Sequence, residues 1–141
     1  MYRTIRHIPV LIFLGLLAAC GNDNPTTTPT NTTIPTSVTE TFSGTLTQNG
    51  STTHPFVTRG GTVTATITTL SPDSTTVVGL TLGTWNGEGC QTVINNDRAT
   101  QGAVVIGTAS TTGNLCVRVY DAAGSLTQPT DYEVQVVHPP T

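Results

Sequence analysis

Thr62-Val63-Thr64-Ala65-Thr66-Ile67-Thr68 is the stretch that decides the fold class. Val63, Ala65 and Ile67 alternate with threonines, so one face of an extended chain is apolar and the other is hydroxylated. Threonine, valine and isoleucine all favour β-strands over helices. The stretch therefore predicts a β-strand with one face in a core and the other in solvent.

Short runs of the same kind continue on both sides of this strand, separated by Gly, Pro, Asn and Asp. The predicted strands are residues 41–47, 54–58, 62–68, 76–85, 90–94, 103–108, 115–120 and 132–137. No segment shows a sustained 3.6-residue apolar period. We therefore expect an all-β fold, an antiparallel jelly-roll-like β-sandwich of about eight strands over residues 39–138, followed by a tail at 139–141.

The alternation also assigns faces to individual strands. Phe42 and Leu46 are expected on one side of the first strand, and Pro55 indicates an edge position for the second. In the strand at 103–108 we expect Val104 and Ile106 to point inward. The polar residues 95–101 are predicted to form a loop.

Charge limits the classes of partner. Charged residues make up 9% of the sequence, and lysine is absent. After residue 19 the chain keeps three arginines against eight acidic residues, which gives a formal charge of −5. This distribution lacks the basic footprint of a nucleic-acid-binding protein.

The first 20 residues have the order of an export signal. Arg3 and Arg6 precede an apolar run at 10–17, and Ala18-Ala19-Cys20 follows it. A positive start, an apolar middle and small residues at the end are typical of a secretory signal peptide. A transmembrane anchor is the alternative, but the run is shorter than the ~20 apolar residues that a spanning helix needs.

The cysteine directly after the small pair resembles the lipobox of bacterial lipoproteins. That resemblance implies cleavage between Ala19 and Cys20, lipidation of Cys20, and attachment to a membrane through the N-terminal lipid. Gly21 at the second mature position implies the outer membrane, with the domain facing the periplasm or the cell surface. An ordinary signal peptide would leave Cys20 as an unexplained odd cysteine.

Residues 20–38 form a Thr-, Pro- and Asn-rich stretch, in which only Ile34 and Val38 offer apolar side chains. Such a composition cannot offset its ordering entropy with core contacts, so we predict a disordered tether. The remaining two cysteines, Cys90 and Cys116, are expected to form a disulfide in an oxidising compartment, with their Cα atoms ~4.4–6.8 Å apart. Because Leu115, Val117 and Val119 would face the core, we expect the bridge on the outer face or across an edge.

Several stretches then occur in a recognisable order. They are Phe42-Ser43-Gly44-Thr45-Leu46, His54-Pro55-Phe56, Gly61-Thr62-Val63-Thr64-Ala65 with Leu70, Val78-Gly79-Leu80 with Leu82-Gly83-Thr84-Trp85, Cys116-Val117-Arg118-Val119-Tyr120-Asp121, and Asp131-Tyr132 with Val134, Val136 and His138-Pro139. This order resembles the bacterial pre-peptidase C-terminal domain, a β-sandwich appended to secreted peptidases, and its free-standing lipoprotein relatives. The resemblance covers residues 39–138 and consists of strands and turns, not catalytic residues.

The resemblance implies an extracellular accessory module that is not itself an enzyme. Some members of that family bind calcium or polymers such as collagen and carbohydrate. In this sequence we expect a leader and a tether, and not a peptidase, before the domain.

Two sets of residues are candidates for ligand binding. Trp85 with Asn86 and Glu88 could grip a sugar face, although Trp85 could equally cap the core. Asp97, Asp121 and Asp131 could supply oxygen ligands for calcium, although such residues are also common in turns because they bind the backbone. His54 and His138 lack metal-ligand spacing and are expected to be structural.

No Gly-x-Ser-x-Gly elbow and no phosphate-binding loop with lysine occurs. We therefore expect a non-catalytic, lipid-anchored cell-envelope module with a structural or accessory binding role and no cofactor. The alternative is a module that binds a carbohydrate or protein polymer, with or without calcium. An extracellular polymer or an envelope protein is the expected partner, and the sequence predicts no oligomeric state.

Overall fold

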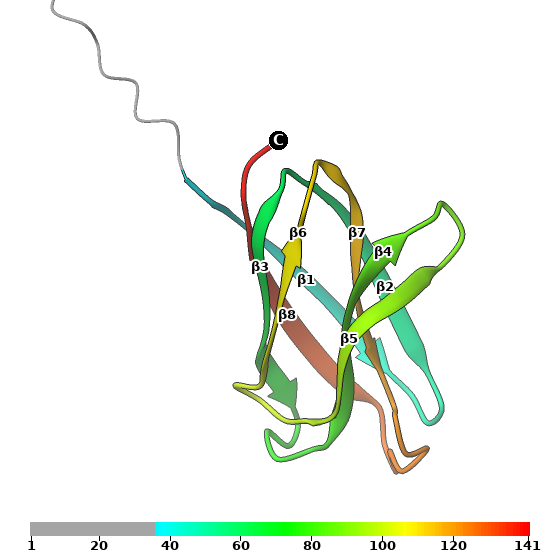
Figure 1. The fold of residues 1–141 in the computed structure, drawn as a ribbon. Helices are drawn as coiled ribbons and strands as arrows, with labels where there is room; N and C mark the ends of the chain where they lie inside the picture. Colours follow the sequence, from blue (N-terminus) through cyan, green and yellow to red (C-terminus); the bar gives the residue numbers. More distant parts are fainter. Residues whose placement is uncertain (1–35) are drawn as a thin grey trace, which may run out of the picture. The chain divides into compact units, whose positions relative to one another are not determined.

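The computed structural model describes residues 36–141, which contain eight β-strands and no helix, and so no helix that could cross a membrane (Figure 1). The predicted signal peptide (1–19), Cys20 and residues 21–35 of the predicted tether lie outside the described residues. The strands are β1 (Val38–Leu46), β2 (Ser51–Thr58), β3 (Gly61–Ser71), β4 (Val78–Trp85), β5 (Cys90–Ala99), β6 (Val104–Ala109), β7 (Gly113–Tyr120) and β8 (Thr130–His138).

The strands form two four-stranded antiparallel sheets, with the orders β1-β8-β3-β6 and β2-β7-β4-β5. The pairs β1·β8, β2·β7, β3·β6 and β4·β5 are all hydrogen-bonded neighbours. The first half of the chain thus pairs with the second half like one long hairpin, which is rolled into two layers (Figure 1). This arrangement confirms the predicted jelly-roll-like β-sandwich.

The core lies between the two sheets and follows the predicted alternation. Val63, Ala65 and Ile67 of β3 are fully buried against Val78, Leu80 and Leu82 of β4 and their neighbours. Leu46 is buried and Phe42 packs partly against the same cluster, as expected. Pro55 lies on β2, which is an edge strand of its sheet.

The predicted loop at 95–101 is wrong over most of its length. β5 continues to Ala99, and Asn95 and Asn96 pair with Thr81 and Leu80 of β4. One irregularity in the β4·β5 register, between Val78 and Leu80, lies opposite these polar residues. Pairing with a buried neighbouring strand therefore overrides the low intrinsic strand preference of Asn and Asp.

The predicted facing of β6 is also wrong. Val105 is 5% exposed and points inward, whereas Val104 and Ile106 are 46% and 59% exposed. Residues 103–106 are all apolar, so alternation within the strand does not determine which side faces the core. The pairing with β3 decides it, because Val105 lies opposite the buried Ala65.

Candidate functional site

The outer face of the sheet β2-β7-β4-β5 combines aromatic, cationic and disulfide groups in one layer. Leu115, Val117 and Val119 of β7 pack toward the core, so the intervening residues point outward as predicted. On β4, the outward positions lie opposite those of β7 in three pairs. These pairs are Gly79 with Tyr120, Thr81 with Arg118, and Gly83 with Cys116.

The predicted disulfide is present and crosses a strand. Cys90 on β5 and Cys116 on β7 are bonded, with their Cα atoms 5.7 Å apart. β4 lies between these two strands, and the bridge passes over it at Gly83. A Cβ at Gly83 would lie 3.1 Å from Sγ of Cys90 and would overlap the carbonyl oxygen of Gln91. The missing side chain at Gly83 is therefore what lets β5 be joined to β7 on the outer face.

A second glycine supports the aromatic end of the layer. The ring of Tyr120 lies over Gly79, where any Cβ would overlap the ring. The Tyr120 hydroxyl donates a hydrogen bond to Oδ1 of Asp97 on β5. Hydrogen bonds from Tyr120 and Asn95, together with the nearby positive charge of Arg118, hold the pKa of the Asp97 carboxyl below its ordinary value. Tyr120 is thus fixed at both its ring and its hydroxyl.

Arg118 lies between the tyrosine and the disulfide. Its guanidinium carbon is 4.8 Å from the centroid of the Tyr120 ring, a cation–π distance. One terminal nitrogen lies 3.4 Å from Oγ1 of Thr92 on the edge strand β5. Within residues 36–141, neither Nε of Arg118 nor Oγ1 of the buried Thr81 has a hydrogen-bond partner. Arg118 is therefore held mainly by stacking and packing.

Trp85 occupies the other end of the layer. It is half-buried, pairs with Cys90, and is not a member of the core cluster. Trp85 is thus neither fully exposed nor part of the core cluster, and it lies next to the disulfide. Oδ1 of Asn86 accepts the backbone N–H groups of Glu88 and Gly89 at 3.0 and 2.8 Å. Asn86 thus shapes the turn after Trp85, and the exposed Glu88 lies within that turn.

The three calcium candidates are not brought together. Among the described residues, no group of three His, Cys, Asp or Glu side chains could hold a metal ion. Asp97 is bonded to Tyr120, and Asp131 accepts a hydrogen bond from Thr45 across the β1·β8 pair. The third candidate, Asp121, accepts hydrogen bonds from the backbone of a loop.

Asp121 connects the loop 121–129 to the turn between β1 and β2. Its carboxylate accepts the backbone N–H groups of Asn49, Ser125 and Leu126 at 3.1–3.2 Å. Its own N–H donates to the Gly50 carbonyl at 2.9 Å. Burial raises the pKa of the Asp121 carboxyl, but the backbone N–H groups outweigh burial and hold the pKa below its ordinary value.

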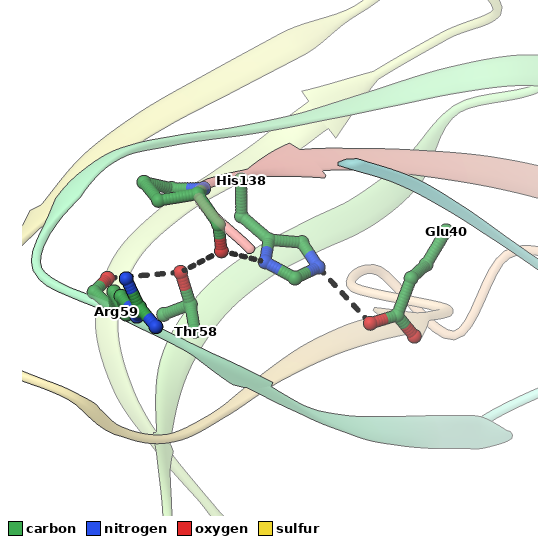
Figure 2. Close-up of polar contacts among 5 residues, drawn as sticks. Glu40, Thr58, Arg59 and His138 are labelled. Atoms are coloured by element: carbon green, nitrogen blue, oxygen red, sulfur yellow. Dashed lines mark hydrogen bonds and ion pairs between the residues drawn. The ribbon is translucent and has the colours of Figure 1, made fainter. Parts of the chain in front are cut away.

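His54 and His138 both lie near the edge where β1 and β2 approach each other. The His138 ring is 2% exposed, with Nε2 3.0 Å from Oε1 of Glu40 and Nδ1 2.9 Å from the Pro139 carbonyl oxygen (Figure 2). The Thr58 hydroxyl lies 3.2 Å from the same carbonyl oxygen. In a nucleophilic site this hydroxyl would face the imidazole, but here it contacts backbone carbonyls. The cluster is therefore a structural connection between the two sheets.

His54 belongs to an aromatic group at the same edge. Its ring stacks on Phe42 at 4.9 Å between centroids, and its Nε2 lies 2.7 Å from the Tyr132 hydroxyl. Burial lowers the pKa of His54 and raises that of Tyr132. Both groups are thereby favoured in their neutral forms.

At the opposite edge, between β5 and β6, the two sheets leave a hollow of about 310 Å³. Its walls are largely apolar and include Leu82, Ile94, Gly107 and Leu115. Trp85 does not line this hollow.

Comparison with known proteins adds no identity: no family model matches the chain, and no curated protein does.

Sequence reasoning identified Cys90, Cys116 and Trp85 but missed Arg118, Tyr120 and the two supporting glycines. The signal for Arg118 and Tyr120 was the alternation of β7, which places Cys116, Arg118 and Tyr120 on one face. The glycines carry no comparable signal, because a glycine within a strand usually weakens the prediction of that strand.

Proposed function

We propose that this chain is a lipid-anchored cell-envelope module with a non-catalytic accessory role, and that the outer face of β2-β7-β4-β5 is its binding surface. The order of charged, apolar and small residues before Cys20 supports the anchor. The resemblance of residues 39–138 to the pre-peptidase C-terminal domain supports the accessory role. The geometry of the outer face supports the binding surface.

One observation carries the proposal of a binding surface: a preorganised layer of groups on a single face. Tyr120 lies over Gly79, the disulfide lies at Gly83, Arg118 is the cross-strand partner of Thr81, and Trp85 follows at the end of β4. Trp, Tyr and Arg are the side chains enriched at binding hot spots. Rigid support beneath them reduces the entropy that binding would otherwise cost.

The shape of this layer favours a carbohydrate polymer as the ligand. Gly79, which lies opposite Tyr120, is six residues before Trp85 on β4. This separation corresponds to ~20 Å of strand. An extended ligand could contact both aromatic rings, with its apolar ring faces against the aromatics and its hydroxyls toward Arg118 and Thr92. Asp97 offsets the charge of the neighbouring Arg118, which favours an uncharged polysaccharide.

Affinity electrophoresis tests this proposal directly. The full chain, purified in detergent, is run through gels that contain hydroxyethylcellulose or solubilised peptidoglycan. We expect retardation of the unsubstituted chain and at least ~10-fold weaker binding after Trp85→Ala, the loss typical of a hot-spot aromatic. Val137→Ala, on the outer face of the other sheet, is the matched control and should bind normally. Equal migration of all three chains in both gels would refute the carbohydrate assignment.

A further inference from the structure

Each sheet of the sandwich has two edge strands, and one of the four differs from the others. β1 carries Glu40, β2 carries Pro55, and β5 carries Asp97 and Arg98. Charges and prolines on edge strands prevent unwanted pairing with other chains. β6 carries neither. Its only hydrogen-bonded neighbour among the described strands is β3 (Figure 1).

The stretch of sequence around β6 is also free of charge. No charged residue occurs between Arg98 and Arg118 in the sequence, although the chain as a whole is acidic. Ile106 and Val104 are among the large apolar side chains that the described residues expose, at 59% and 46%. A second copy at this edge therefore gains apolar contacts. It also avoids the repulsion between carboxylates that it would meet elsewhere on the surface.

Small inward-facing residues on β6 open the hollow between the sheets. Gly107 points toward Ile94 and Leu82, and a Cβ there would lie 3.3 Å from Cδ1 of Ile94. The hollow of about 310 Å³ extends from Gly107 to Thr111 along this edge. A strand added beside β6 would place every second side chain at the mouth of this hollow.

We propose that β6 is a self-association edge, at which a second copy of this chain pairs antiparallel about a two-fold axis through Ile106. This register places Ile106 opposite Ile106 of the second copy and Val104 opposite its Thr108. Val105 of the second copy then lies beside Gly107, and the reverse holds by symmetry. The two four-stranded sheets that contain β6 thereby join into one sheet of eight strands.

Self-complementarity is what favours a second copy over another partner. A two-fold axis brings each segment against itself, so an uncharged edge meets an uncharged edge. The same operation at β2 would place Pro55, which lacks an N–H, in the new ladder. Among the four edge strands, β6 alone carries neither a charged residue nor a proline.

Cysteine cross-linking in the full chain tests the axis and the register. With Ile106→Cys, the new Cα atoms would lie ~4.5–5.5 Å apart across the axis, within the range for a disulfide. We expect this variant to become largely a covalent dimer under oxidising conditions, seen as twice the monomer mass on a non-reducing gel.

Two single variants serve as matched controls. Thr108→Cys lies on the same strand and face, but its copies would be about four residues, or ~13 Å, apart, which is beyond disulfide range. Val57→Cys places an exposed thiol on the edge strand β2. Both should remain monomeric, whereas the double variant Val104→Cys/Thr108→Cys should cross-link.

The absence of covalent dimer from both Ile106→Cys and the double variant, each with its Cys90–Cys116 bond intact, would overturn the proposal. Cross-linking of Thr108→Cys or Val57→Cys to the same extent as Ile106→Cys would overturn it too, because it would show random collision or a different register. The result is independent of polysaccharide binding, which is measured on the other sheet.

Discussion

At the scale of single residues, Asp121 makes the clearest contribution to stability. Its carboxylate accepts three backbone N–H groups from two separate loops. Removal of the carboxylate leaves these donors without their partner, which costs more than the bond itself contributes. We expect Asp121→Ala to lower Tm by at least about 4 °C in circular dichroism melts. Asp73→Ala, which removes bonds confined to an exposed turn, is the control and should change Tm far less.

The same carboxylate predicts a dependence of stability on pH. The pKa of Asp121 is lower in the folded chain than its ordinary value. The unfolded chain therefore binds more protons at acid pH, so stability is complete above about pH 4 and falls as the pH drops below the unfolded value. Urea titrations between pH 6 and pH 2.5 should show a smaller loss of stability for Asp121→Asn than for the unsubstituted chain. An identical loss in the two proteins would contradict the assignment.

At the scale of strands, the disulfide joins β5 to β7 across β4. It closes a loop with a sequence separation of 26 residues. Cross-links of this kind typically contribute ~2–5 kcal/mol to the free energy of unfolding. We expect Cys90→Ala/Cys116→Ala to lose that amount in chemical denaturation while it keeps its β-rich circular dichroism spectrum. A reductant should destabilise the unsubstituted chain similarly and leave the double variant unchanged. Free thiols in the oxidised protein would contradict this account.

The strands also show how far local pattern determines structure. The clean alternation of 62–68 predicted both the existence and the facing of β3, and β7 behaved in the same way. β6 was placed correctly but turned the wrong way, because four consecutive apolar residues contain no alternation. The polar end of β5 was assigned to a loop, because only its pairing with the buried strand β4 makes it a strand.

At the scale of the whole molecule, the sequence predicted the fold class and the cysteine pair. It could not predict which strands become neighbours, because the β1·β8 and β2·β7 pairs join segments far apart in the chain. The candidate face depends on those pairings. Tyr120 comes to lie over Gly79, and the disulfide over Gly83, only when β7 and β4 are adjacent.

The anchor gives the next prediction at this scale. If Cys20 is the lipidated N-terminus, Cys20→Ser should be released from membranes or remain unprocessed with its leader attached. The unsubstituted chain should fractionate with the outer membrane. The measurement is immunoblotting of membrane and soluble fractions, with mass spectrometry of the N-terminus. A normally cleaved and membrane-bound Cys20→Ser chain would contradict the lipid anchor.

Fluorescence of Trp85 tests the central claim, a polymer-binding outer face, most directly. Trp85 is the only tryptophan in the chain, so its emission reports on this face alone. On titration with hydroxyethylcellulose or solubilised peptidoglycan, we predict a saturable change in emission that Arg118→Ala weakens and Val137→Ala leaves unchanged. Emission that stays constant with both polymers, up to concentrations that saturate known polysaccharide-binding modules, would contradict the account.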